Sequence, residues 1–381
     1  MNSVYFDHNA TTQIDSSVLA AMLPWMQLQN GNPTSRHSFG RSARDAIEHA
    51  RTQVAEACGA YANQVIFTAS GTEANNFAIK GMAASRPTSQ ILCSAIEHPC
   101  VTRPALAMQT LGYSSNQIAV DRQGKIDLTQ LQNQLKTPTA LVSVMLANNE
   151  TGAVQDLAGI AQLARANGAL IHSDAVQALG KVAVNFSELG LHAMSVSSHK
   201  IHGPQGAAAM ILDKRIDIQP LLHGGGQEKG LRSGTENIAA IVGFGLACEL
   251  AVSNLGDYQA RTQALRTQLE QGLSALNLNI FADKTARLSN TSFFAVQDIE
   301  GETLVMALDR QGYAVASGSA CSSDSTEPSH VLLAMGVAPD IARGAVRVSF
   351  SAHNTAAQVA NFLAVLTNQI SKLKQLSAMA A

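Results

Sequence analysis

The 381-residue chain has few cysteines, little charge and no long apolar run, and each shortage excludes a class of protein. The five cysteines are an odd number and no two are spaced as C-x-x-C, so neither a disulfide framework nor a structural zinc site is expected. With a net charge of −2, the chain has no overall positive charge that would attract nucleic acid or an anionic membrane surface. The longest charge-free apolar stretch, residues 237–248, is too short for a membrane helix, which needs about 20 residues.

The N-terminus also lacks the cationic start and apolar block of a signal peptide, and the predicted location is the cytoplasm. His199, His202 and His223 do not share a metal-ligand spacing, so no metal site is expected. Apolar residues make up 46% of the chain, which is enough for a sizeable core in about two domains.

Residues 64–212 alternate short apolar runs with helical periodicity, which predicts an α/β layer with a mostly parallel sheet. Strands are expected at residues 65–68, 91–94, 141–146, 169–172, 193–196 and 207–212. Helices are expected at residues 73–84, 101–111, 128–135 and 157–166. After Asn237, two long helical patterns, strand-like runs and a closing helix predict a smaller α+β domain. These later elements are expected at residues 238–250, 258–276, 288–295, 313–316, 345–349 and 356–375.

Three motifs in the α/β region together suggest a pyridoxal phosphate site. Residues 68–73 join a strand to a helix, where backbone N–H groups and the positive helix end can hold a phosphate. Asp174 follows a buried strand, where a carboxylate can hold a protonated ring nitrogen, and Gln177 can reach the same side. Lys200 also follows a buried strand, and partial burial favours the neutral amine that Schiff-base chemistry needs.

Each motif also has an ordinary structural explanation. Ser70 or Thr72 could simply cap the helix, Asp174 could cap the next one, and Lys200 could lie in a turn. The order of the three motifs along one α/β domain is what favours the cofactor site.

Four further residues are candidates for chemistry or binding. His98 follows a strand and could stack on a flat cofactor or move protons, although a lone histidine is more often structural. Arg347 lies in an apolar run and needs an anion, either a substrate carboxylate or an internal salt bridge. Thr235 could cap a helix or offer its hydroxyl to a phosphate. Cys321 lies in a loop of small residues. It is either a candidate nucleophile or a loop cysteine with no role in the chemistry. The contexts of Cys58, Cys93 and Cys248 are those of core residues.

With these motifs, the sequence resembles the cysteine desulfurases of the fold-type I pyridoxal phosphate superfamily, in the aminotransferase class V group. The Ser-Gly-Ser-Ala-Cys loop followed by Glu327-Pro328-Ser329-His330 resembles the class I subgroup, whose cysteine loop is long and mobile. The other matching segments, which extend the resemblance over almost the whole chain, are Tyr5 to Thr12, Asn32 to His37, Ala147 to Gly152 and Arg347 to Phe350.

The resemblance implies a large domain, residues 14–256, with a mostly parallel seven-stranded sheet flanked by helices. It also implies a small α+β domain, residues 1–13 together with 257–381, that carries the cysteine loop. In the large domain, Lys200 would hold pyridoxal 5′-phosphate as a Schiff base. Asp174 would pair with the pyridinium nitrogen, Gln177 would bond the phenolic oxygen, and His98 would stack over the ring and relay protons.

Further roles are implied for phosphate and substrate. Arg347 would clamp the substrate α-carboxylate, and Cys321 would take the sulfur as a persulfide. Thr235 would reach the phosphate of the neighbouring subunit's cofactor, which implies a homodimer with shared active sites. The residues implied to hold phosphate are Gly71, Thr72, Ser197 and His199, and Asn149 would line the cofactor or substrate.

The implied reaction converts L-cysteine to L-alanine and passes sulfur to an acceptor, such as an iron–sulfur scaffold protein, or into tRNA thiolation or cofactor biosynthesis. The alternatives are a selenocysteine lyase, another class V lyase, and a non-catalytic assembly subunit on the same fold. The sequence departs from the family at His8, where asparagine is usual, and it ends soon after Leu376, where housekeeping members carry a longer tail that docks a scaffold.

Overall fold

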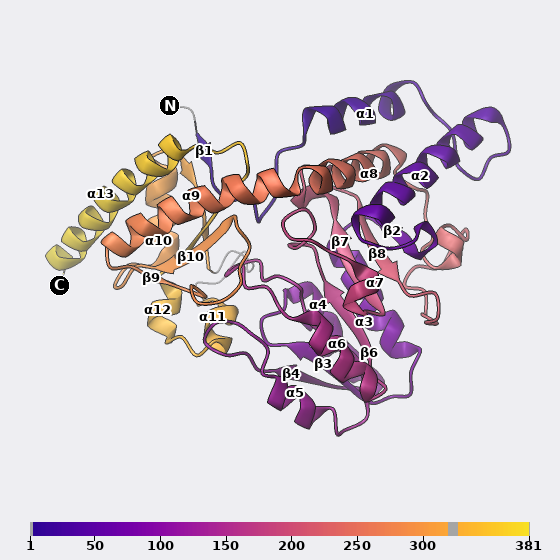
Figure 1. Cartoon of the computed structure of the whole chain (residues 1–381), viewed down its shortest axis with the longest axis horizontal. Helices are drawn as coiled ribbons and strands as arrows, with labels where there is room; N and C mark the ends of the chain where they lie inside the picture. The colour runs from indigo at the N-terminus through magenta and orange to yellow at the C-terminus, as the bar shows by residue number, and fades with distance from the viewer. Residues whose placement is uncertain (1–2, 319–326, 381) are drawn as a thin grey trace.

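The computed structural model describes residues 3–318 and 327–380 (Figure 1). Its central sheet has strands β2 (Val65–Thr68), β3 (Gln90–Ser94), β4 (Ser114–Ile118), β5 (Thr139–Ser143), β6 (Leu170–Asp174), β7 (Ala193–Ser197) and β8 (Ala208–Leu212). Their order across the sheet is β2-β8-β7-β6-β5-β3-β4. Strand β8 runs antiparallel to both neighbours, and the other pairs are parallel. The expected seven-stranded, mostly parallel sheet is therefore confirmed.

Strands β2, β3, β5, β6, β7 and β8 are buried along their whole length, as expected for strands covered on both faces. One face packs against α1 (Ser16–Gln27), α2 (Ser38–Ala57), α5 (Leu128–Gln134), α6 (Leu157–Ala166), α7 (Phe186–Leu189) and α8 (Ile238–Ser253). The other face packs against α3 (Gly71–Ala84) and α4 (Pro99–Ala107). Alternate residues of each strand point into the two cores, so that Ile171 faces one and Leu170 the other.

A second, antiparallel sheet has the order β12-β13-β10-β9. Its strands are β9 (Asn279–Ile280), β10 (Thr291–Ala295), β12 (Ala316–Ser317) and β13 (Ala345–Ser349). Beside it, β1 (Val4–Tyr5) pairs with β11 (Tyr313–Ala314), and Asp7 bridges to Ser349, so the start of the chain lies against its last third. The nearby helices are α9 (Leu255–Ala275), α10 (Gly301–Asp309), α11 (His330–Ala334), α12 (Pro339–Arg343) and α13 (Ala356–Ala380).

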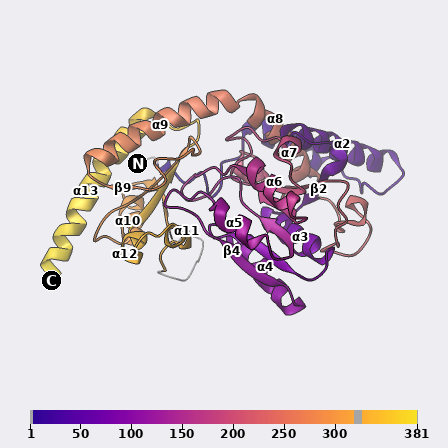
Figure 2. The same cartoon turned by 60° about the horizontal axis from the view of Figure 1, so that its bottom comes forward.

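Helix α9 passes from the first sheet to the second, as both views show (Figures 1 and 2). Together with α10 and α13 it covers a core built around Phe6, Phe350 and Phe362, whose rings pack edge to face. Among the described helices none is by itself long and apolar enough to span a membrane; α8 and α9 meet that criterion only when joined, and they are bent by 70°.

Several elements differ from those expected from the sequence. The apolar pattern did not predict α1, α2 or β4. The helix expected at residues 101–111 is α4 followed by a 3₁₀ turn, Met108–Leu111. The strand expected at residues 141–146 is β5, which ends at Ser143.

His172, on β6, is fully buried between the two cores and hydrogen-bonds the hydroxyls of Ser143 and Ser195 at 2.9 and 3.0 Å. Burial lowers the pKa of His172 to about 3. An unfolded histidine binds its proton near pH 6.5, so between these values the unfolded chain binds a proton that the folded chain does not. The folded state is therefore destabilised as pH falls, by about 2 kcal/mol at pH 5 from this residue.

We expect His172→Gln to lose less unfolding free energy than the parent between pH 7 and pH 5, because the substituted side chain does not titrate. Urea unfolding at both pH values measures the loss. The exposed His49 on α2 gives the control, His49→Gln, in which the loss should equal that of the parent. An unchanged loss in His172→Gln would contradict the prediction.

Candidate active site

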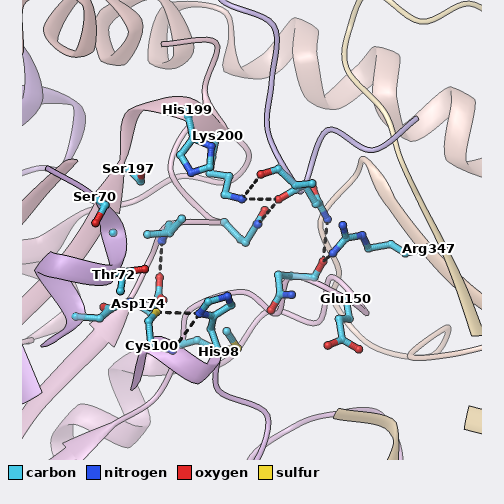
Figure 3. Close-up of a pocket in the computed structure, with 18 of the residues that line it drawn as sticks. Ser70, Thr72, His98, Cys100, Glu150, Asp174, Ser197, His199, Lys200 and Arg347 are labelled. Atoms are coloured by element: carbon cyan, nitrogen blue, oxygen red, sulfur yellow. Dashed lines mark hydrogen bonds between the residues drawn. The ribbon is translucent and has the colours of Figure 1, made fainter. Parts of the chain in front are cut away.

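A cavity of about 460 Å³ lies at the carboxyl ends of the parallel strands, between the two sheets (Figure 3). Loops after β2, β3, β5, β6 and β7 supply one side, and β12, β13 and the N-terminal segment supply the other. This edge is where open α/β sheets bind their ligands. The sequence-predicted residues that line the cavity are Gly71, Thr72, His98, Asn149, Asp174, Gln177, Ser197, His199, Lys200 and Arg347.

Two predicted residues are not among these. Thr235 is exposed, in the segment before α8, and does not line the cavity within this chain. Cys321 lies outside the described residues, although Ser317 and Gly318, shortly before it, line the cavity. The core environments predicted for Cys58, Cys93 and Cys248 are confirmed, since all three are buried.

The N-terminus of α3 forms one end of the cavity. Ser70 Oγ accepts a hydrogen bond from the Glu73 N–H at 3.1 Å, so the expected helix cap is present. A Cβ atom on Gly71 would lie 3.1 Å from Val176 Cγ2 and 3.5 Å from Ser197 Cβ, so glycine keeps this corner open. His199 borders the same end, and burial, with the nearby Lys200 and Lys181, lowers its pKa to about 4. The positive helix end and a neutral imidazole can together hold an anion.

Asp174, at the end of β6, is a buried carboxylate with two donors. Its Oδ1 accepts from the Val176 N–H at 2.9 Å, and its Oδ2 accepts from Asn75 Nδ2 at 2.6 Å. Burial nevertheless raises the pKa of Asp174. A cation in the cavity would stabilise the ionised form, because opposite charge favours it.

Lys200 ends a short 3₁₀ turn, Ser198–Lys200, directly after β7. Its Nζ donates to the carbonyl oxygens of Asn9 and Ala10 at 2.7 and 2.6 Å. Figure 3 shows the lysine and His98 on opposite sides of the cavity, with the α3 terminus at one end and Arg347 at the other. A flat ring between them would have the amine on one face and the imidazole on the other.

His98 is the N-cap of α4, and its Nδ1 accepts from the Cys100 backbone N–H at 3.2 Å. The Cys100 Sγ is 2.9 Å from the same nitrogen. Burial lowers the pKa of His98, so the ring is neutral near pH 7. Because a backbone N–H can only donate, Nδ1 carries the lone pair, and the ring hydrogen belongs on Nε2.

Arg347, on β13, is buried, and donates to the Asn149 carbonyl at 2.9 Å and to Asp7 Oδ1 at 2.7 Å. The internal salt bridge that the sequence left as an alternative is therefore present. Within the described part of the chain, Arg347 Nε has no hydrogen-bond partner despite its burial. An arginine with an unused donor at a cavity wall can bind a further carboxylate.

Sequence reasoning gave no role to several side chains of this cavity, among them Asn9, Asn75, Cys100 and Glu150. Asn9 and Glu150 lie inside segments that carry the family resemblance, which was the available signal. Cys100 ends the short motif that begins at Glu97 and contains His98, but Asn75 stands in no motif, and only the packing of α3 places it at the cavity. Over the ranges 3–318 and 327–380, no cluster of three His, Cys, Asp or Glu side chains could hold a metal ion.

The fold and cavity define an α/β enzyme that can hold a phosphorylated aromatic cofactor. The family model "Aminotransferase class-V" matches residues 4–362, and the chain belongs to this family. Cysteine desulfurase 2 of Trichormus variabilis is 42% identical over 99% of this chain and 95% of its own length. The cysteine desulfurase of Cereibacter sphaeroides is 43% identical over 100% and 99% of the two chains. Cysteine desulfurase IscS of Dictyoglomus turgidum is 40% identical over 98% and 96%.

Solved structures show the same similarity. The NifS-like protein of Rickettsia africae has a TM-score of 0.89 and 36% identity, over 97% of this chain and all of its own. The structure of SspA in complex with cysteine has a TM-score of 0.80 and 29% identity, over 92% of this chain and 99% of its own. Enzymes of this family depend on pyridoxal 5′-phosphate. The open corner at Gly71, the buried Asp174 and the lysine opposite His98 fit that cofactor.

We expect Gly71→Val to weaken binding of pyridoxal 5′-phosphate to the apo chain by about tenfold or more, because the new side chain fills the corner beside Ser197. Absorbance titration of the apo chain with the cofactor measures this. Gly256→Val is the control, since a Cβ there meets nothing within 4 Å. Equal affinity of the Gly71 variant and the parent would show that phosphate binds elsewhere.

Proposed function

We propose that this protein is a pyridoxal-phosphate-dependent cysteine desulfurase, with Lys200, Asp174, Arg347 and Cys321 as its principal residues. The observation that carries the assignment is that Lys200, Asp174 and Arg347 line one cavity that the start of the cysteine loop also lines. The similarity to SspA, whose structure was solved in complex with cysteine, supports L-cysteine as the substrate.

When bound, pyridoxal 5′-phosphate supplies a ring that withdraws electrons from the α-carbon of an attached amino acid. The buried Asp174 carboxylate, held by Asn75 and the Val176 N–H, would keep a proton on the ring nitrogen. Gln177 would donate a hydrogen bond to the ring oxygen. Ser197, His199 and the first turn of α3 hold the phosphate, and Asn149 lines the space beside the substrate.

Arg347, which lines the cavity, binds the substrate carboxylate with its guanidinium group and so aligns the amino acid. The Lys200 amine removes the α-proton. His98, as an unprotonated imidazole, accepts a proton first and returns it afterwards. In the relay that the resemblance implies, it is therefore the acceptor that helps to form the Cys321 thiolate.

Cys321 attacks the substrate sulfur as a thiolate. The new bond joins the two sulfurs, the bond between sulfur and the β-carbon breaks, and the carbon chain leaves as L-alanine. The balance is L-cysteine plus thiol to L-alanine plus persulfide. No outside oxidant is needed, because the β-carbon is reduced as the sulfur is oxidised. The persulfide then passes to a protein acceptor, such as an iron–sulfur scaffold, in the cytoplasm.

We expect the working enzyme to be a homodimer in which Thr235 reaches the phosphate of the neighbouring site. The exposure of Thr235, away from the cavity of its own chain, supports this arrangement. Exposed apolar side chains on α1, directly after it and in the first turn of α2 also support a subunit contact; they are Leu19, Leu23, Met26, Leu28 and Phe39.

The experiment that tests the function is mass spectrometry after incubation with L-cysteine. We expect one added sulfur atom on Cys321 and one alanine formed for each. Cys321→Ala should form neither, whereas Cys248→Ala, which alters a buried thiol in α8, should behave as the parent. Sulfur on another residue, or full alanine production by Cys321→Ala, would refute the assignment. A much faster reaction with L-selenocysteine would favour the lyase alternative.

Arg347→Gln should raise the KM for L-cysteine by about 10- to 100-fold, because a charge-assisted contact to the substrate carboxylate is lost. Steady-state alanine formation measures this. The control is Arg287→Gln, since Arg287 is an equally buried arginine that pairs with Glu270 outside the cavity. A KM that rises equally in both variants would argue that Arg347 is structural.

A further inference from the structure

Lys181 is a buried lysine that the proposed chemistry does not use. It is 2% exposed, in the turn that follows β6. Its Nζ donates to Gln177 Oε1 at 2.7 Å and to Asn9 Oδ1 at 3.0 Å. Lys181 lines a second cavity of about 290 Å³ and not the active-site cavity, so it reaches the active site only through these two partners.

The lysine controls which way the Gln177 amide faces. A lysine nitrogen in this position donates, so it requires the carbonyl oxygen of the amide on its own side. The NH₂ group of Gln177 is thereby directed away from Lys181, where it now donates to the Asn9 carbonyl at 2.9 Å. An amide presented this way offers the cavity a donor, whereas the rotated amide would offer it an acceptor.

The same nitrogen also anchors Asn9. The Asn9 carbonyl accepts both from Gln177 and from the Lys200 amine at 2.7 Å. The Asn9 side chain bonds Thr291, Asn290 and the Asn149 carbonyl, which fixes the N-terminal segment against the second sheet. Lys181 therefore supports Gln177 and Asn9, and the Asn9 carbonyl is one of the two that accept from Lys200.

Both partners of Lys181 are acceptors. Its Nζ lies at hydrogen-bond distance from Gln177 Oε1 and Asn9 Oδ1, so it donates to both groups and orients both. Burial, with the positive charges of Lys200 and Arg347, lowers the pKa of Lys181 well below its usual range.

We propose that Lys181 is a positioning residue that holds the Gln177 amide with its NH₂ group toward the active-site cavity and holds Asn9 beside Lys200. The proposal rests on the proposed function, in which Gln177 donates to the phenolic oxygen of pyridoxal 5′-phosphate. Lys181 acts through Gln177 and does not touch the cofactor.

The test uses the purified holoenzyme and Lys181→Met, which keeps the length of the side chain and removes its donors. A donor to the phenolic oxygen stabilises negative charge there and lowers the pH at which the cofactor's visible absorbance changes. Loss of the oriented donor should raise that midpoint by about one pH unit. The affinity of the apo chain for the cofactor should fall about tenfold. Lys125→Met is the matched control, because Lys125 donates to the Val154 carbonyl outside the cavity.

A double-mutant comparison separates positioning from general stability. In a Gln177→Met background, Lys181→Met should move the midpoint no further, because the amide it orients is gone. Lys181→Arg retains donors and should keep the midpoint close to that of the parent, which preserves the test if Lys181→Met does not fold.

An unchanged midpoint in folded Lys181→Met would overturn the proposal, as would the same shift in the Gln177→Met background or a shifted midpoint in Lys181→Arg. Failure of the proposed function gives a different result. Parent protein that is incubated with pyridoxal 5′-phosphate and then desalted would retain no cofactor absorbance.

Discussion

The parallel register of β6 and β7 is the constraint on which the rest of the site depends. In this register Asp174, the last residue of β6, lies opposite Ser195 on β7, so the turn that carries Lys200 begins just beyond it. Both strands are buried along their whole length, between one core built on α2 and α8 and another built on α3 and α4. A register shift of one residue in either strand would turn each of its side chains toward the opposite core. Packing therefore fixes the register, and with it the spacing of the Asp174 carboxylate and the Lys200 amine.

The cavity needs both sheets. The first supplies the helix end, Asp174 and Lys200, and the second supplies Arg347. Asn9 joins the two, because its main chain and side chain bond Gln177, Lys181 and Lys200 on one side and Thr291 and Ser349 on the other. The two sides of the cavity are thus held at a set separation by hydrogen bonds between residues hundreds of positions apart.

Much of this could be predicted from the sequence, for physical reasons. Strand β2 is a short apolar run with a glycine-containing turn after it, and its predicted and observed bounds coincide. Helix α2 is rich in polar residues, and β4 is an exposed strand of mostly polar residues, so neither gives the apolar signal on which the prediction relied. The motif residues Asp174 and Lys200 could be found because each lies at or shortly after the carboxyl end of an apolar strand. Lys181 could not, since its environment is created by Asn9, a residue 172 positions away.

The structure accommodates His8, which stands where the family usually has asparagine. It is buried, its ring packs edge-on against Tyr5, and its pKa is lowered to about 3, chiefly by burial. Its Nδ1 has no hydrogen-bond partner among the residues that the structure describes. A neutral ring can occupy this place beside Asn9 without adding charge to a region that already holds Lys181 and Lys200.

The central claim is that the amine of residue 200 forms the covalent bond to pyridoxal 5′-phosphate. Reduction of the holoenzyme with borohydride, followed by peptide mapping, tests it most directly. The account predicts a stable phosphopyridoxyl group on the peptide containing Lys200 and none on the peptide containing Lys181. A label on Lys181 or on any other side chain, or no label, would contradict it.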